Sequence, residues 1–280
     1  KIAVGVARQI NAVLNSLDRL EVWGRDSAGI SILFVLDREA FSDFEASLAD
    51  AGALENYRKR CEQPLLVNKS ISLRRMGNPD ENAPVTIALT YKLAAEIGKL
   101  GDNIQFIRNQ VKNDPVFQHL MLRPHLHFTV SSHTRWASVG AINEFNCHPV
   151  DACTDSFASA ETGILHVSLN GDIDNYQTLK NRHAADGIRY PDEITCDTKI
   201  IPVHVSHYYR KGHTIEEAFR LAVNDFEGSH AICMHTDLAP GKVFLALKGS
   251  GQALFIGMAP DLYIPTSEVY GFVEETSNFL

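Results

Sequence analysis

Three short stretches of this chain carry side chains that together suit recognition of a free amino acid. Arg135 supplies a planar guanidinium, which can give a carboxylate two parallel charge-assisted hydrogen bonds. Asp197 supplies a carboxylate for an ammonium group. Asn170, through its side chain, and Gly171, through its backbone N–H, offer two neutral donors for an oxyanion that develops on an amide carbonyl. The set therefore predicts a pocket for a zwitterion with a reactive amide, and it contains no nucleophile.

Each of these groups is expected at the end of a regular element. Residues 126–132 lead into Arg135 and residues 163–169 lead into Asn170, and both segments have the pattern of β-strands. Asp197 directly precedes an expected helix, where its carboxylate could also serve as an N-cap. Strands that end at these residues would hold them firmly and still let them reach a cleft.

The rest of the pattern predicts sheets with outer helices. An apolar stripe at helical spacing predicts a first helix over residues 2–21, and residues 27–36 form an apolar run typical of a buried strand. A capping box at Thr214 opens a helix that runs to Phe226. A further helix is expected over 198–210, with Pro202 in its first turn, and further strands over 229–237, 242–248, 252–258 and 262–273. The implied layering is helix, sheet, sheet, helix.

The region between residues 37 and 125 carries no recognisable chemistry. Residues 38–80 are polar and broken, with a short helix expected at about 40–60 and a turn-rich segment at 78–82. An apolar stripe at steps of three and four predicts one long helix, or two helices joined at Gly98 to Gly101. Its seven members are Leu89, Leu93, Ile97, Leu100, Ile104, Ile107 and Val111. We interpret 37–125 as a helical insertion on the surface, a decoration or an oligomer contact rather than a separate catalytic domain.

Five stretches of the chain occur in the order seen in a known family. They are Gly24 to Gly29 (GRDSAG), His133 to Ser138 (HTRWAS), Asn146 to Pro149 (NCHP), Asn170-Gly171 and Asp197-Thr198. On these stretches the chain resembles the class II glutamine amidotransferases, and most of all the glutaminase domains of glucosamine-6-phosphate synthases, over residues 2–36 and 129–280. The resemblance implies an α+β fold, a four-layer αββα sandwich of the N-terminal-nucleophile (Ntn) hydrolase type with a helical insertion. A single amidotransferase domain would then span residues 1–280.

The resemblance also implies a role for each candidate residue. Arg135 corresponds to the arginine that grips the α-carboxylate of glutamine, and Ser138 stands in the place of a threonine that assists it. Asn170 and Gly171 correspond to the oxyanion pair, and Asp197 to the aspartate that holds the α-amino group. The chain departs from the family pattern at Trp23, Val139 and Leu169.

Structural interpretations remain open beside these roles. Arg135 could be a structural arginine paired with an acid, and Asn170-Gly171 is also a signal for a type I′ turn. The segment 26–29 is interpreted as a tight turn that shapes the site. Trp136 is included among the substrate-binding residues, as a packing wall rather than a reactive group.

The attacking group of the family is the thiol of an N-terminal cysteine, whose own α-amino group acts as the base. This chain begins with Lys1, and its cysteines are Cys61, Cys147, Cys153, Cys196 and Cys233. We expect an N-terminal nucleophile segment before Lys1 and a synthase domain of sugar-phosphate isomerase type after Leu280. The chain alone is then expected to be inactive. The alternative is a domain that lost its nucleophile and only binds glutamine.

The function that the resemblance implies is hydrolysis of L-glutamine to glutamate and ammonia. The ammonia would pass to a sugar phosphate, converting fructose 6-phosphate to glucosamine 6-phosphate; amidotransferases with other acceptors are an alternative. The expected partners are L-glutamine and the isomerase domain, with a homo-oligomer conceivable, and no cofactor is expected. His125, His127, His133 and His148 could suggest a metal, but no cysteine or carboxylate stands at ligand spacing, so no metal is expected.

Composition narrows the class of protein further. The net charge of −8 and the isoelectric point near 5.8 argue against nucleic acid or an anionic membrane as a partner, because both attract basic surfaces. The longest apolar run, Ile30 to Leu36, is too short to cross a bilayer. Five cysteines without regular spacing are typical of a reducing compartment, which predicts a cytoplasmic protein.

Overall fold

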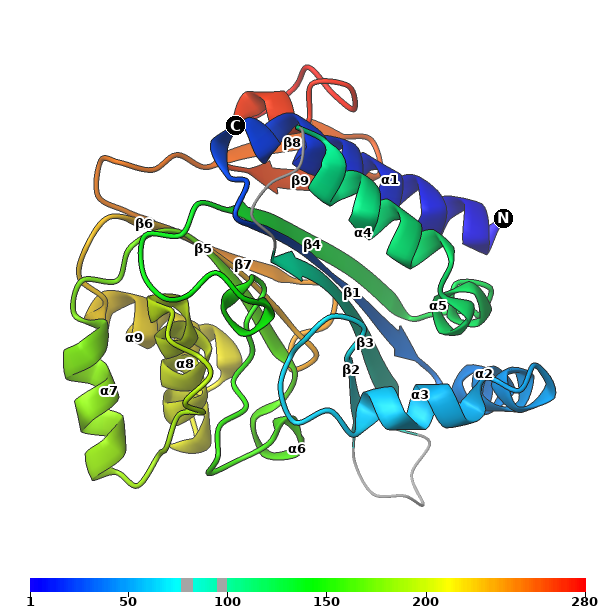
Figure 1. The fold of residues 1–280 in the computed structure, drawn as a ribbon, viewed down its shortest axis with the longest axis horizontal. Coiled ribbons are helices and arrows are strands. Elements are labelled where there is room, and N and C mark those ends of the chain that lie inside the picture. The colour runs from blue at the N-terminus through cyan, green and yellow to red at the C-terminus, as the bar shows by residue number, and fades with distance from the viewer. Residues whose placement is uncertain (77–82, 95–99) are drawn as a thin grey trace.

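The computed structural model describes residues 1–76, 83–94 and 100–280. In that part of the chain two antiparallel β-sheets lie face to face, with helices on the outer side of each (Figure 1). The first sheet has the order β2-β3-β1-β4, with β1 (Ser27–Leu36), β2 (Ile71–Arg75), β3 (Val85–Ala94) and β4 (His127–Arg135). The second has the order β5-β6-β7, with β5 (Leu165–Gly171), β6 (His230–Thr236) and β7 (Val243–Lys248). A separate hairpin consists of β8 (Phe255–Ala259) and β9 (Leu262–Thr266).

Helices cover the outer face of each sheet. Along the first sheet, α1 (Ile2–Leu20) contacts β4, and α4 (Asp102–Lys112) contacts β3 and β1 (Figure 1). Along the second sheet, α8 (Ile200–Arg210) contacts β5 and α9 (Ile215–Asp225) contacts β7, with α7 (Tyr176–Ala185) packed on α8. The remaining helices are α2 (Arg38–Asp50), α3 (Leu54–Cys61), α5 (Pro115–Leu120) and the one-turn α6 (Ser159–Thr162). These layers confirm the expected αββα sandwich of the α+β class.

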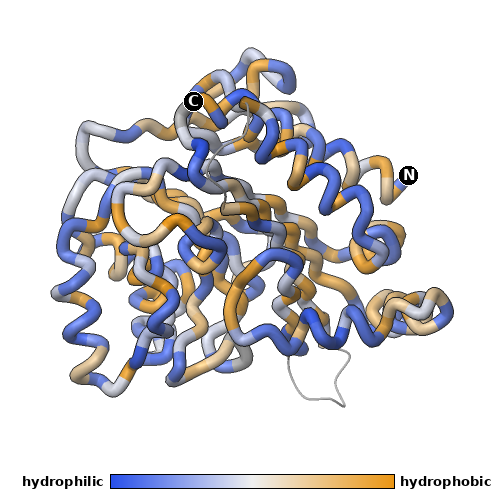
Figure 2. Tube along the Cα trace, viewed as in Figure 1, coloured by the Kyte–Doolittle hydropathy of each residue, from blue (hydrophilic) through white to orange (hydrophobic). Residues whose placement is uncertain are grey.

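Strand β1 lies between β3 and β4 in the first sheet, and all ten of its residues are buried. Its even-numbered residues, from Ala28 to Leu36, belong to the apolar core that the sheet forms with α1, α2, α4 and α5. Its odd-numbered residues face the second sheet, where Ser31 Oγ lies 2.6 Å from His166 Nδ1 and 3.1 Å from His235 Nε2. Figure 2 shows hydrophobic residues gathered along the strands of this sheet. The expected buried strand is therefore confirmed.

The second half of the molecule follows the sequence closely. Leu165, Val167 and Leu169 of β5 pack into a second apolar core with α7, α8 and α9. Pro202 is the third residue of α8, in the first turn as expected, where its missing N–H costs no helical hydrogen bond. Thr214 caps α9 by accepting a hydrogen bond from the N–H of Glu217 at 3.3 Å. The last expected strand is shorter than predicted, because β9 ends at Thr266 and a 3₁₀ turn follows it.

The region expected to be a helical insertion is partly strand. The long helix predicted from Leu89 to Val111 is wrong at its start, because Leu89 and Leu93 lie in β3 and only Ile104, Ile107 and Val111 lie in α4. Leu100 is in a turn and is 51% exposed. Ile97, Gly98 and the turn expected at 78–82 lie outside the described residues.

Strand β3 makes this region part of the sheet. It pairs with β1 along ten residues, from Ser27 opposite Ala94 to Leu36 opposite Val85, and with β2 on its other edge. The one short helix expected at about 40–60 is two helices, α2 and α3, separated by a turn in which Gly52 has φ of +67°. The segment 37–125 therefore contributes core strands as well as helices. Within the described residues, no helix has the length and apolar character needed to cross a membrane.

Candidate functional site

Arg135 is the last residue of β4, where it pairs with Ser27 of β1. The turn before β1 holds it in place: Arg135 C=O accepts from the N–H of Asp26 at 3.1 Å, and the Asp26 carboxylate accepts from the N–H of Ala137 at 2.7 Å. Gly24 is required beside it, because a Cβ there would lie 2.8 Å from the carbonyl carbon of Arg135. The GRDSAG stretch thus builds the support of Arg135, as expected for a structural turn.

The guanidinium of Arg135 is only partly used by the protein. The residue is 6% exposed, and its Nη2 donates to the carbonyl of Val139. Its Nη1 is buried and has no hydrogen-bond partner among the described residues. A buried cationic donor without a partner is costly and marks a place where an anion would be stabilised. The interpretation of Arg135 as one half of a structural ion pair finds no support, because the described residues offer Nη1 no carboxylate.

Asn170 and Gly171 end strand β5, opposite Ala231 and His230 of β6. They therefore do not form the two-residue turn that their types could also signal. Gly171 has φ of +103°, and a Cβ at this position would lie 2.1 Å from the carbonyl oxygen of Ser229. Only glycine fits there, and the Asn170 side chain stands exposed beside it at the strand end.

Asp197 begins a 3₁₀ turn ahead of α8 and is 5% exposed. Its carboxylate accepts from the N–H of Ile173 at 2.9 Å and from the hydroxyl of Thr198 at 3.4 Å. Neither this turn nor α8 has a side-chain cap, so the interpretation of Asp197 as an N-cap is not supported. Burial raises the pKa of the Asp197 carboxyl, and the nearby charge of Arg135 lowers it only in part. An ammonium group bound here would favour the ionised form.

One segment joins the three parts of the site. Ser138 Oγ donates to the carboxylate of Asp172 at 2.6 Å, directly after the Asn170-Gly171 pair. The N–H of Ala141 donates at 3.1 Å to the Oγ1 of Thr195, which lies two residues before Asp197. Gly140 has φ of +88° and lies against the backbone of Cys196. A Cβ at this position would be 2.8 Å from the backbone nitrogen of Cys196. Residues 138–141 therefore lie against both turns and link the end of β4 to them.

Sequence reasoning missed the role of Asn146, which is fully buried. Its Oδ1 accepts from the N–H groups of Thr195 at 2.7 Å and Cys196 at 2.9 Å, and its Nδ2 donates to Asn143 Oδ1 at 2.9 Å. One amide thus fixes the turn that carries Asp197. The NCHP stretch was the available signal, but the contact spans 50 residues of sequence and needs the fold to be seen.

Trp136 and the cysteines do not take catalytic positions. Trp136 is 77% exposed, so it packs little against the described residues, and its place among the substrate-binding residues stays a prediction. Burial raises the pKa of the Cys147 and Cys196 thiols and raises that of Cys233 to about 12, which opposes formation of a thiolate. The described residues contain no group of three or more histidine, cysteine or carboxylate side chains placed to hold a metal ion.

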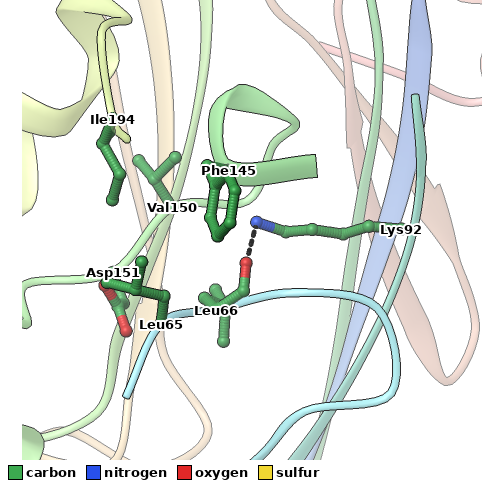
Figure 3. Close-up of a pocket in the computed structure, with 7 residues that line it drawn as sticks. All are labelled: Leu65, Leu66, Lys92, Phe145, Val150, Asp151 and Ile194. Carbon is green, nitrogen blue, oxygen red and sulfur yellow. Dashed lines mark hydrogen bonds between the residues drawn. The ribbon is translucent and has the colours of Figure 1, made fainter. Parts of the chain in front are cut away.

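Two hollows lie near the site. Figure 3 shows the first, in which Lys92 donates to the carbonyl of Leu66 at 2.5 Å. Lys92 is 1% exposed, and it also donates to the carbonyl of Glu144 at 3.3 Å. This hollow has no room for a water molecule, so it serves packing. The second has a volume of about 20 Å³ and reaches Asp197. Its lining residues are Tyr176, Lys180, Tyr190, Ile194, Thr195, Cys196, Asp197 and Ile200.

Comparison with known proteins finds a similar fold and similar sequences. No protein-family model matches it. A solved structure described as the allosteric regulatory enzyme of purine biosynthesis superimposes with a TM-score of 0.52, covering 94% of this chain and 40% of that chain at 16% identity. At that identity the likeness shows the fold alone. The chain therefore shares its fold with that enzyme.

Several curated relatives share the name glutamine–fructose-6-phosphate aminotransferase (isomerizing). The protein of Geobacillus kaustophilus is 31% identical over 158 residues, which are 56% of this chain and 24% of that protein. The protein of Clostridium tetani is 32% identical over 144 residues, 51% of this chain and 21% of that protein. The chain thus spans about a quarter of the length of these relatives. The resemblance inferred from the five stretches is confirmed.

Proposed function

We propose that this chain is a glutaminase domain that hydrolyses L-glutamine to glutamate and ammonia. The observation that carries the proposal is the segment 138–141, whose hydrogen bonds join the end of β4 to the turns after β5 and before α8. This arrangement supports a common site for Arg135, the Asn170-Gly171 pair and Asp197. The α-carboxylate of glutamine pairs with the guanidinium, and its ammonium group pairs with the carboxylate. The carboxylate of glutamine displaces the Val139 carbonyl from the arginine.

In the proposed reaction the side-chain amide carbon of glutamine faces a cysteine thiolate that lies upstream of Lys1. The thiolate forms a bond to this carbon, and the carbonyl oxygen takes the negative charge. Asn170 Nδ2 and the Gly171 N–H donate to that oxyanion. Collapse of the tetrahedral species breaks the carbon–nitrogen bond, and the nitrogen leaves as ammonia after taking the proton that the cysteine thiol gave to its own α-amino group. Water then hydrolyses the γ-glutamyl thioester and releases glutamate.

The acceptor of the ammonia is proposed from the relatives. Their name specifies fructose 6-phosphate, so we propose that the ammonia passes to this sugar phosphate in a synthase domain outside the 280 residues. The product would be glucosamine 6-phosphate. We further propose a cytoplasmic location, in which this substrate and glutamine occur together.

Glutamine binding is tested by calorimetry on this chain. We expect L-glutamine to bind, and we expect Arg135→Lys to weaken it by about 10²-fold, because a lysine cannot give the paired hydrogen bonds of the guanidinium. Arg220→Lys is the matched control, since Arg220 lies on the exposed side of α9 and, among the described residues, pairs with Glu217 alone. Equal affinity in both variants would contradict the proposed role of Arg135.

Turnover is tested with the protein that includes the residues upstream of Lys1. We expect release of glutamate and ammonia, and we expect Asn170→Ala to lower kcat by about 10²- to 10³-fold through loss of one oxyanion donor. Binding of glutamine without any turnover in this longer protein would instead establish a glutamine-binding domain. Turnover without transfer to fructose 6-phosphate would leave the glutaminase proposal standing and refute the acceptor.

A further inference from the structure

His148 contacts both the residue beside Asp197 and the residue beside Asn170, and it is 3% exposed. Its Nε2 is 2.8 Å from Thr198 Oγ1, and Thr198 is the neighbour of Asp197. Its Nδ1 accepts from the N–H of Leu169 at 3.5 Å, and Leu169 precedes Asn170. One imidazole thus contacts the residues next to both the carboxylate and the oxyanion pair.

The donors around His148 define its tautomer. Because the Leu169 N–H points at Nδ1, that nitrogen carries no proton, and the proton of the neutral ring is on Nε2. Nε2–H therefore donates to Thr198 Oγ1, which leaves the Thr198 hydroxyl proton free to reach Asp197 Oδ1 at 3.4 Å. The chain of donors runs in one direction, from the ring through the hydroxyl to the carboxylate.

The surroundings keep this ring neutral and in place. Burial lowers the pKa of His148, and the charges of His133, Arg135 and Lys92 lower it further. The ring of His133 packs against it at a centroid distance of 4.5 Å. The backbone is fixed as well, because a Cβ on Gly29 of β1 would lie 2.0 Å from the carbonyl oxygen of His148.

We propose that His148 is a positioning residue, which holds Asp197 through Thr198 and holds the strand end at Asn170 through Leu169. The two groups are thereby kept at one fixed separation, which suits a ligand that must touch both. The identity of that ligand rests on the proposed function, whereas the hydrogen-bond chain itself does not. The two contacts come from elements 29 residues apart in sequence, at Leu169 and Thr198, and His148 joins them.

Two substitutions of His148 separate its two contacts. His148→Asn keeps an acceptor near the position of Nδ1 but has no atom that reaches Thr198. His148→Gln keeps a donor near the position of Nε2 but offers no acceptor to Leu169. Thr198→Val removes the hydroxyl at constant size, and Thr198→Ser restores it. All four are compared with the unchanged chain, with circular dichroism to verify folding.

The readout is the affinity for L-glutamine relative to glutaramate, which is glutamine without its α-amino group. If the chain prefers glutamine, we expect His148→Asn and Thr198→Val to lower the affinity for glutamine by about tenfold. The affinity for glutaramate should change by less than about twofold. His148→Gln and Thr198→Ser should keep the original preference. A preference that is unchanged in Thr198→Val and His148→Asn would overturn the inference while leaving the proposed function intact.

A second measurement does not depend on glutamine. Nitrogen-15 NMR of the histidine side chains should show His148 with a protonated Nε2 and a bare Nδ1, and Thr198→Val should shift the Nε2–H resonance. A ring protonated on Nδ1 would overturn the inference. If the chain bound no glutamine at all, the proposed function would fail, and this spectrum alone would decide whether His148 makes the two contacts.

Discussion

The two faces of strand β1 differ sharply in chemistry although both are buried. The face toward the helices is apolar from end to end, with Ile30, Ile32 and Phe34 at its centre. The face toward the second sheet carries Ser27, Gly29 and Ser31 before it turns apolar. Helix packing therefore supplies the stable core, while the layer between the sheets is built for polar contacts.

The polar layer also changes along its length. At the far end a small apolar cluster of Leu33, Val35, Ala88 and Ile164 closes it. Nearer the candidate site it contains histidines and hydroxyls instead, and several of their atoms have no hydrogen-bond partner among the described residues. These atoms include Thr90 Oγ1, His166 Nε2, Ser168 Oγ and His235 Nδ1. Since unpaired buried polar atoms cost stability, this end of the layer contributes to function more than to folding.

Lowering the pH should destabilise the protein more than any substitution below, because the polar layer contains buried histidines. Burial lowers the pKa of His133 and of His166 to about 4, and lowers those of His148 and His235 well below the ordinary value. Between pH 6.5 and 4 the unfolded chain therefore binds protons that the native state does not, so stability is lost as the pH falls through this window. We expect a loss of about 2 kcal/mol at pH 5 for each of His133 and His166, about 4 kcal/mol together, and a further loss from His148 and His235.

The measurement is urea unfolding at pH 7, 6 and 5. His166→Gln should reduce the slope by up to about 1.4 kcal/mol per pH unit, because one of the titrating rings is removed. Stability that is constant over this range would contradict the assignment of a neutral histidine layer.

The apolar face should respond most to loss of volume. Phe34 is fully buried and stacks near Phe128 at a centroid distance of 4.8 Å. Phe34→Ala should lower the free energy of unfolding by about 3–5 kcal/mol, because it leaves a cavity that the surrounding core cannot fill. Val35→Ala, on the other face of the same strand, is the control with a smaller expected loss. Equal losses in the two variants would mean that the faces do not differ as proposed.

The sequence predicted the helices and strands whose apolar residues recur at a clear spacing. Its main error, the helix predicted from Leu89, has a geometric reason. Residues four apart share a face in a helix and also in a strand, so Leu89 and Leu93 fit both patterns. The alternation of β3, with Thr86, Thr90 and Lys92 between apolar residues, is a strand signal that the prediction of a helix did not use. Strand ends at Arg135 and Asn170 were predicted because each follows a recognisable strand.

The supporting residues of the site could not be predicted in the same way. Asn146 and His148 act on Thr195, Thr198 and Leu169, which are far away in sequence. Their residue types are compatible with many roles, and only the folded chain shows which donors and acceptors they meet. Local pattern therefore predicts where the main groups stand, and tertiary contacts decide how they are held.

Ser31 tests a polar contact that is satisfied. Its hydroxyl lies within hydrogen-bond distance of both His166 and His235, at the centre of the layer between the sheets. Ser31→Ala should lower the free energy of unfolding by about 1–3 kcal/mol, because it leaves two buried imidazole nitrogens without a partner. Urea unfolding at pH 7 measures this change. A neutral result would show that the two rings find other partners.

Thr90, on the neighbouring strand β3, tests the opposite case, a buried polar group that is not satisfied. Its hydroxyl has no hydrogen-bond partner among the described residues. Its backbone is already paired, because its N–H donates to the carbonyl of Ser70 at 3.0 Å. Thr90→Val replaces the hydroxyl by a methyl group of similar size, so it removes the cost of the unpaired oxygen without opening a cavity. We expect the free energy of unfolding to rise by about 1 kcal/mol. Thr86→Val should behave alike, while Thr198→Val, which removes a hydroxyl bonded to His148, should not stabilise the protein. A destabilised Thr90→Val variant would mean that an ordered water satisfies the hydroxyl. In that case the layer between the sheets is hydrated, and its polar atoms are paired through solvent rather than left open.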